Sequence, residues 1–182
     1  MTAVYIQPYQ AQPAAFHPYD PRFPEVAALL IEAIESQDRR LRVEHIGSTS
    51  VPECGGKGVI DLIVTYAVGD LEIAKKALST LGFHAQGGRD PFPESRPMRE
   101  GSVALLGSLF RIHAHVIVRN GEEHRRLAGF RDALRTDDGL RMAYEADKKR
   151  ILDSGVDDSL DYCNAKTDFI VSTLAAIIQN IE

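Results

Sequence analysis

The chain has 182 residues, of which 44% are hydrophobic, and 21 basic against 26 acidic side chains give it a formal net charge of -5. A chain of this length can bury roughly 70% of its unfolded surface in one domain, and its basic residues are scattered, which argues against a dedicated nucleic-acid-binding protein. Two distant cysteines give no sign of a disulfide framework, and no stretch predicts export or a membrane span. We therefore expect one cytoplasmic domain over residues 1–182.

The first 24 residues contain five prolines, which forbid a continuous helix or a central strand. We expect a proline-rich arm over residues 1–24 that lies on the domain and holds at most a short extended segment near Val4–Ile6. Apolar residues then recur at three- and four-residue spacing, which predicts an amphipathic helix over residues 25–37.

The middle of the chain alternates between strand and helix patterns. We expect strands at 42–46 and 58–65, a helix at 70–80, a surface loop at 87–97, and a hairpin over 102–118 with its turn at Gly107-Ser108. The second hairpin strand alternates strictly, so Arg111, His113 and His115 share one face, with the two imidazoles about 7 Å apart.

From residue 121 onward the pattern is helical, with breaks that predict helices at about 122–136, 138–153 and 158–180. The last helix carries an apolar stripe from Phe169 to Ile178. The order of elements predicts an α/β (α+β) fold, in which helices flank a mixed sheet and the C-terminal third is helical.

Asp61 lies inside an otherwise apolar strand, where a carboxylate is unfavourable unless a cation or hydrogen-bond donors meet it. We therefore expect it at a strand end, holding a metal or a proton. About a dozen residues earlier, Gly47, Ser48 and Thr49 form a turn whose amides and hydroxyls could donate to a phosphate. By itself this turn is more typical of a helical cap, but a Gly-Ser turn followed by a strand carboxylate is the arrangement of nucleotidyltransferase folds.

Residues 44–64 read EHIGSTSVPECGGKGVIDLIV, and this stretch resembles the signature of the GrpB family of the nucleotidyltransferase superfamily. The later segments RIHAHVIV, GEEHRRLAGFRDALR, LRMAYEADKKRIL and DYCNAKTDFI also resemble that family, so the resemblance runs from about Tyr19 to Ile170. It implies a nucleotidyltransferase-like mixed sheet, but no settled reaction. A related domain fused to dephospho-coenzyme A kinase suggests a link to coenzyme A metabolism.

Two departures from the relatives bear on mechanism. Where relatives read Ala-Val-Pro-Gly-Leu-Ala-Ala-Lys-Pro, this chain has two adjacent glycines within residues 50–58, which predicts a more flexible loop. Active members of the superfamily usually place a second acidic residue two positions after the first, and here that position is Ile63. One carboxylate cannot bridge two magnesium ions in the usual way, so the ordinary two-metal mechanism is not expected.

His113 and His115 offer a replacement, since together with Asp61 they could bind Zn²⁺, Mn²⁺ or Ni²⁺ more readily than Mg²⁺. The expected cofactor is a divalent metal ion, Mg²⁺, Mn²⁺ or Zn²⁺. In the alternative, one histidine bonds a neighbour such as Glu44 and the other only lines the site. Glu44 is itself a candidate metal ligand, because its strand-mate Arg42 indicates a polar face.

Three basic residues are candidates for binding an anionic ligand. Lys57 precedes the Asp61 strand and could neutralise a phosphate, although a solvated loop lysine is an equally good explanation. Lys166 and Arg131 match positions of the family, whereas their spacing alone is typical of exposed helix residues.

The leading hypothesis is a protein that binds a nucleotide or other phosphorylated small molecule with a divalent cation and transfers a nucleotidyl or phosphoryl group. The alternatives are a non-catalytic ligand-binding module and a metal-dependent hydrolase. No dedicated nucleic-acid partner and no membrane partner is expected, and the oligomeric state stays open.

Overall fold

The computed structural model describes residues 4–179, apart from the side chains of residues 159 and 177–179, and has a mixed six-stranded sheet at its centre. The strands follow the order β1-β5-β6-β3-β2, and β4 pairs with β5. In chain order the elements are β1 (Ile6–Gln7), α1 (Phe23–Glu35), β2 (Arg42–Ile46), the short 3-10 helix η1 (Ser48–Ser50), β3 (Val59–Tyr66), α2 (Leu71–Thr80), β4 (His84–Ala85), β5 (Met98–Leu105), β6 (Ser108–Val118), α3 (Glu122–Thr136), α4 (Asp138–Asp153), α5 (Ser159–Ala165) and α6 (Thr167–Gln179).

The pairing register places the polar strand residues on one face of the sheet. β3 and β6 run parallel, with Asp61 opposite His113 and Ile63 opposite His115. β2 runs antiparallel to β3 and sets Glu44 beside Ile63. Since paired residues share a face, the expected face of β6 is confirmed, and we call this side of the sheet the polar face.

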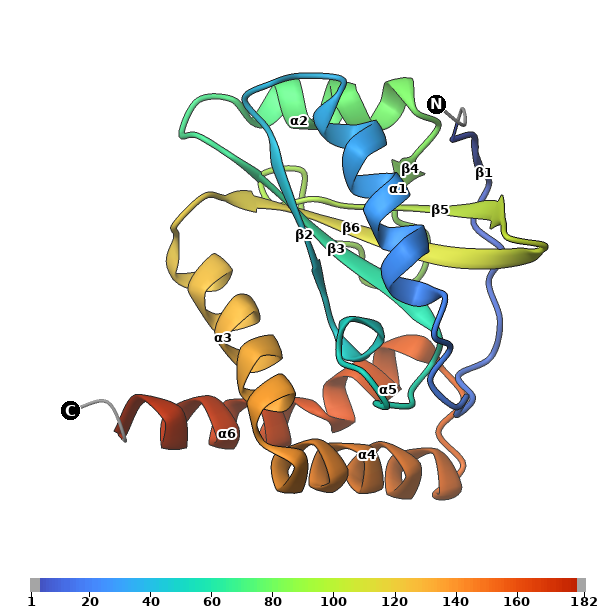
Figure 1. Ribbon diagram of the computed structural model, residues 1–182, viewed down its shortest axis with the longest axis vertical. Coiled ribbons are helices and arrows are strands. Elements are labelled where there is room, and N and C mark those ends of the chain that lie inside the picture. The colour runs from blue at the N-terminus through green and yellow to red at the C-terminus, as the bar shows by residue number, and fades with distance from the viewer. Residues whose placement is uncertain (1–3, 180–182) are drawn as a thin grey trace.

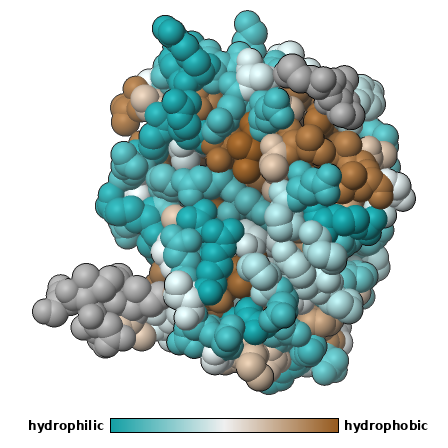
Figure 2. Space-filling model, viewed as in Figure 1, coloured by the Kyte–Doolittle hydropathy of each residue, from teal (hydrophilic) through white to brown (hydrophobic). Residues whose placement is uncertain are grey.

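The opposite face carries the main hydrophobic core. Leu62 and Ile112 on the central strands pack with Leu30 of α1 and Leu78 of α2, all fully buried. Figure 1 shows α1 lying across the strands and α2 beyond one end of it, with α3 to α6 gathered in the other half of the molecule. Figure 2 shows hydrophobic residues reaching the surface in the half where α1 lies, while the half over the C-terminal helices is mostly hydrophilic.

A second core joins the C-terminal helices to the loop that follows η1. Val51 and Cys54 are buried with Phe130, Tyr144 and Leu174, while the side chains of 177 and 178 lie outside the described part of the chain. The prediction of a flexible loop was therefore wrong at its apolar positions, because burial of these side chains fixes the segment.

The glycines of the same loop are packed as well. The amide and carbonyl of Gly56 pair with those of His17, and a Cβ at Gly55 would overlap the ring of Phe16. The ammonium of Lys148, 1% exposed, donates to the Gly55 carbonyl and lies 3.3 Å from Cys54 Sγ. Because these glycines have no side chain, other parts of the same chain pack closely against them.

The expected elements are confirmed, but strand β4 was not predicted and three details differ. β5 begins at Met98, and the hairpin turn is Leu106-Gly107, both with positive φ, one residue earlier than predicted. The predicted helix over 158–180 is split into α5 and α6 at Lys166. The Thr167 hydroxyl donates to the Cys163 carbonyl, a local bond that competes with regular helix hydrogen bonding.

The proline-rich segment contributes a strand. Ile6 pairs with Val103 in β5, which places residues 6 and 7 at the edge of the sheet.

Across the described residues, no helix combines the length and the apolar character needed to span a bilayer.

Candidate functional site

Asp61 lies beside the turn that follows β2, as its pairing with Ile46 requires. Gly47 in that turn has φ +70°, and a Cβ at this position would stand 2.5 Å from Asp61 Oδ2. Only glycine therefore fits both the backbone conformation and the close approach of the carboxylate. The Gly-Ser turn and the strand carboxylate, which the sequence suggested as two parts of one site, lie in direct contact.

The carboxylate of Asp61 is surrounded by potential cations. Its Oδ1 lies 3.5 Å from Nδ1 of His113. Burial raises the pKa of Asp61, but the hydrogen bond from His113 and nearby positive charge, including that of Lys166, lower it to about 2. The group is therefore ionised at neutral pH and suited to binding a cation.

Two lysines approach the same region around the ring of Tyr162. Lys57 Nζ lies 5.0 Å and Lys166 Nζ 5.1 Å from the ring centroid, so Tyr162 contacts both cations. Burial lowers the pKa of Lys57. Burial also disfavours charged Lys166, but the acidic groups around it, Tyr144, Cys163, Tyr162 and Asp61, raise its pKa. This arrangement provides positive charge next to the Asp61 carboxylate.

The turn residues divide into one that holds the turn together and two that can approach a ligand. The hydroxyl of Thr49, which is 2% exposed, donates to the Val59 carbonyl and lies 2.9 Å from Nε2 of His45. Burial lowers the pKa of His45 to about 4, so this imidazole is neutral. Thr49 thus holds the turn together, whereas Gly47 and the partly exposed Ser48 remain suited to a ligand.

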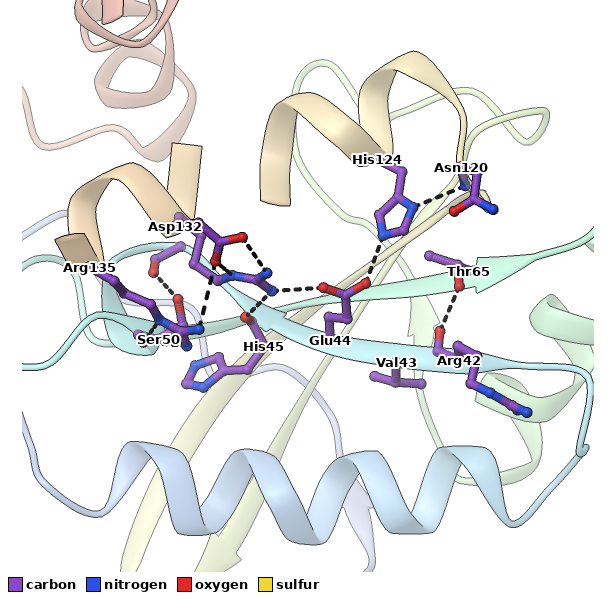
Figure 3. A network of polar contacts seen from close by, with 12 residues as sticks. Arg42, Val43, Glu44, His45, Ser50, Thr65, Asn120, His124, Asp132 and Arg135 are labelled. Carbon is purple, nitrogen blue, oxygen red and sulfur yellow. Dashed lines mark hydrogen bonds and ion pairs between the residues drawn. The ribbon is translucent and has the colours of Figure 1, made fainter. Parts of the chain in front are cut away.

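Glu44 on β2 belongs to a different cluster, which it forms with residues of α3. Its carboxylate accepts from His124 Nε2 at 2.7 Å and from Arg131 Nη1 at 2.8 Å, and Arg131 also pairs with Asp132. Figure 3 shows Glu44 pointing toward His124, with Asp132 on the same side. The structure therefore does not bring Glu44 or Arg131 together with Asp61, and both side chains connect α3 to β2.

His115 contacts residues of the loop that precedes β5. Its Nδ1 lies 3.2 Å from Nη1 of Arg96, and the ring of Phe92 packs edge-on against it at 5.7 Å between centroids. Burial lowers the pKa of His115 to about 3, so it is neutral. Among the residues that the structure describes, no three His, Cys, Asp or Glu side chains gather to hold a metal ion.

Two residues beside the site were not identified as functional groups from the sequence. The hydroxyl of Tyr9 lies 3.1 Å from Nε2 of His113, and Arg111 donates to the Lys57 carbonyl at 2.6 Å. Arg111 could have been found, because it alternates with His113 on β6. Tyr9 gave no signal, since it lies in an arm without periodicity.

The fold is nucleotidyltransferase-like. The structure of Cid1 in complex with its short product ApU matches 72% of this chain and 41% of its own, with a TM-score of 0.50 and 13% identity. The crystal structure of GrpB from Enterococcus faecalis matches 92% of this chain and 99% of its own, with a TM-score of 0.71 and 23% identity. At these identities the likeness defines the fold alone.

The family follows from the sequence. The family model described as GrpB protein matches residues 13–176, so the chain belongs to the GrpB family. A UPF0157 protein of Vibrio cholerae is 35% identical over 120 residues, which are 66% of this chain and 56% of the relative. A UPF0157 protein of Streptomyces coelicolor is 33% identical over 134 residues, 71% of this chain and 65% of the relative. The chain thus spans less than two thirds of either relative.

Proposed function

We propose that this chain binds a nucleotide or other phosphorylated small molecule beside Asp61, together with a divalent cation, and transfers its nucleotidyl or phosphoryl group. One observation carries the proposal: an ionised carboxylate in contact with a Gly-Ser turn lies within electrostatic reach of Lys57 and Lys166. Such a site favours a ligand that combines a metal cation with phosphate oxygens, since the carboxylate attracts the cation and the lysines attract the phosphates.

The donor set fits Mg²⁺ or Mn²⁺ better than Zn²⁺. The protein offers the Asp61 carboxylate with His113 beside it, and Mg²⁺ usually takes one or two carboxylates and completes its shell with water and substrate phosphates. A structural Zn²⁺ site needs four protein ligands and a catalytic one usually three. When bound, such a cation would polarise a phosphoryl oxygen, while Gly47 and Ser48 approach the ligand and the lysines neutralise it.

The test is a thermal-shift panel of nucleoside triphosphates, nucleotides and coenzyme A precursors, each with Mg²⁺, Mn²⁺, Zn²⁺ or no metal. A ligand at about 100 times its dissociation constant adds roughly 2.7 kcal/mol, which is a clear rise in melting temperature. We expect a metal-dependent shift in the wild type that is lost in Asp61→Asn. Asp138→Asn, at a carboxylate that is 87% exposed on α4, serves as the matched control and should keep the shift. An equal shift in Asp61→Asn would refute the proposal.

A non-catalytic binding module is the second candidate, and Ile63 favours it. This side chain takes the position of the second carboxylate, is fully buried, and packs with Ile46 and Ile117. The panel gives the same shifts for both candidates, so turnover separates them. Group transfer that is lost in Asp61→Asn supports the enzyme, binding without turnover supports the module, and phosphate release without an acceptor indicates hydrolysis.

A further inference from the structure

The N-terminal arm carries Tyr9 onto the polar face of the sheet. The amide of Tyr9 donates to Nε2 of His84 at 3.0 Å, and the amide of Gln10 donates to the Ser102 hydroxyl at 3.0 Å. The Tyr9 ring packs on the ring of His113, with centroids 5.3 Å apart and an interplanar angle of 31°. Backbone and ring contacts thus fix where the phenol lies.

Tyr9, His113 and Asp61 form a line of polar contacts. The phenol oxygen lies 3.1 Å from His113 Nε2, and His113 Nδ1 lies 3.5 Å from Asp61 Oδ1. An ionised Asp61 favours the tautomer with the proton on Nδ1, which leaves Nε2 to accept the phenol proton. A hydroxyl, an imidazole and a carboxylate in this order are the parts of an activated nucleophile.

His113 is the group placed to take the phenol proton, because it is the only imidazole within hydrogen-bond distance of this hydroxyl among the residues that the structure describes.

We propose that Tyr9 is the acceptor of a nucleotidyl group, so that the chain modifies its own arm, an inference that rests on the proposed function. The Tyr9 oxygen attacks the α-phosphorus of a bound nucleoside triphosphate, His113 Nε2 takes the phenol proton, and the bond from the α-phosphorus to the bridging oxygen breaks. Pyrophosphate leaves with the electron pair of that bond. Lys57 and Lys166 supply positive charge for it.

The experiment uses the full chain with ATP, GTP, CTP or UTP and Mg²⁺ or Mn²⁺, and measures intact mass followed by peptide mapping. We expect one nucleoside monophosphate adduct, on the peptide that contains Tyr9. Tyr9→Phe keeps the ring contact with His113 and should abolish the adduct. Tyr5→Phe changes an arm tyrosine that is 73% exposed and should leave it unchanged.

His113→Gln tests the base. Loss of a general base lowers rates by about 10²- to 10⁴-fold, so with nucleotide at saturating concentration the adduct should form at least about 100 times more slowly. A shift without any adduct, or an adduct that survives Tyr9→Phe, overturns the inference and leaves the proposed function standing. If no triphosphate gives a shift or an adduct, this inference fails, and the proposed function fails with it only when the nucleotides and coenzyme A precursors of the panel give no metal-dependent shift either.

Discussion

Asp61 illustrates how one partly buried carboxylate is kept ionised. Its carboxylate is 29% exposed and has lost most of its water, yet His113 at 3.5 Å and the neighbouring charge of Lys166 stabilise the charged form. The same interactions that prepare this group to bind a cation also make it contribute to folding stability when it is ionised.

This contribution should depend on pH. The pKa of Asp61 is about 2 in the folded chain against an ordinary value of 3.8. A lowered pKa stabilises the folded state above the ordinary value, and the effect is lost as pH falls through the folded value. The difference corresponds to about 2 kcal/mol.

Urea denaturation of wild type and Asp61→Asn between pH 2 and pH 7 measures this effect. We expect the variant to be less stable by about 2 kcal/mol at pH 7, with the difference shrinking between about pH 4 and pH 2. A difference that stays constant over this range would show that the carboxylate charge does not stabilise the fold.

At the scale of elements, α3 is attached to β2 by charged groups as well as apolar ones. Arg131, with a side chain 12% exposed, bonds the Glu44 carboxylate and the His45 carbonyl, while Arg135 donates to the Ser50 carbonyl at 2.7 Å. These bonds occupy carbonyls at the end of an edge strand and beside η1, and they fix the turn that carries Gly47.

A double-mutant cycle on Glu44→Gln and Arg131→Met should measure this attachment. We expect a coupling free energy of about 1 kcal/mol or more, because both groups are largely withdrawn from water and directly bonded. The matched control is Asp147–Arg150 on α4, whose arginine is 71% exposed and whose coupling should be below about 0.5 kcal/mol. Equal couplings for the two pairs would contradict the assignment.

Most elements could be predicted from sequence because their apolar residues recur with a clear period. The start of β5 at Met98 was missed because it follows directly on Pro97 and a Gly/Pro-rich loop, and the break at Lys166 was missed because neither glycine nor proline marks it in the sequence. The neighbourhood of Asp61 and His113 depends on the parallel register of β3 and β6, which residue spacing along the chain does not specify.

At the scale of the whole molecule, the arm adds the edge strand β1 to the sheet and brings Tyr9 to His113 in the candidate site. Ile6 is 2% exposed and packs at Gly101 of β5, where a Cβ would overlap Ile6 Cγ2 and approach the Phe83 ring at 3.4 Å. A side chain at residue 101 and the arm therefore compete for the same space. The position of Tyr9 therefore depends on a glycine of the neighbouring strand β5, which is far from the arm in the sequence.

Gly101→Ala should therefore loosen the arm. We expect a loss of at least about 1 kcal/mol, because overpacking a close contact forces shifts in its neighbours, together with faster amide hydrogen exchange at residues 6–10. Gly129→Ala is the matched control, since its Cβ meets no atom within 4 Å on α3 and alanine favours a helix by about 1 kcal/mol.

The control should thus be more stable than wild type and should exchange normally in the arm. If residues 6–10 of Gly101→Ala exchange at the wild-type rate, the arm is held by contacts other than Ile6. If they exchange faster while the Tyr9 adduct forms as in wild type, Tyr9 reaches its acceptor position without a seated arm. Faster exchange with a matching loss of adduct would show that the seated arm is needed to present Tyr9 to His113.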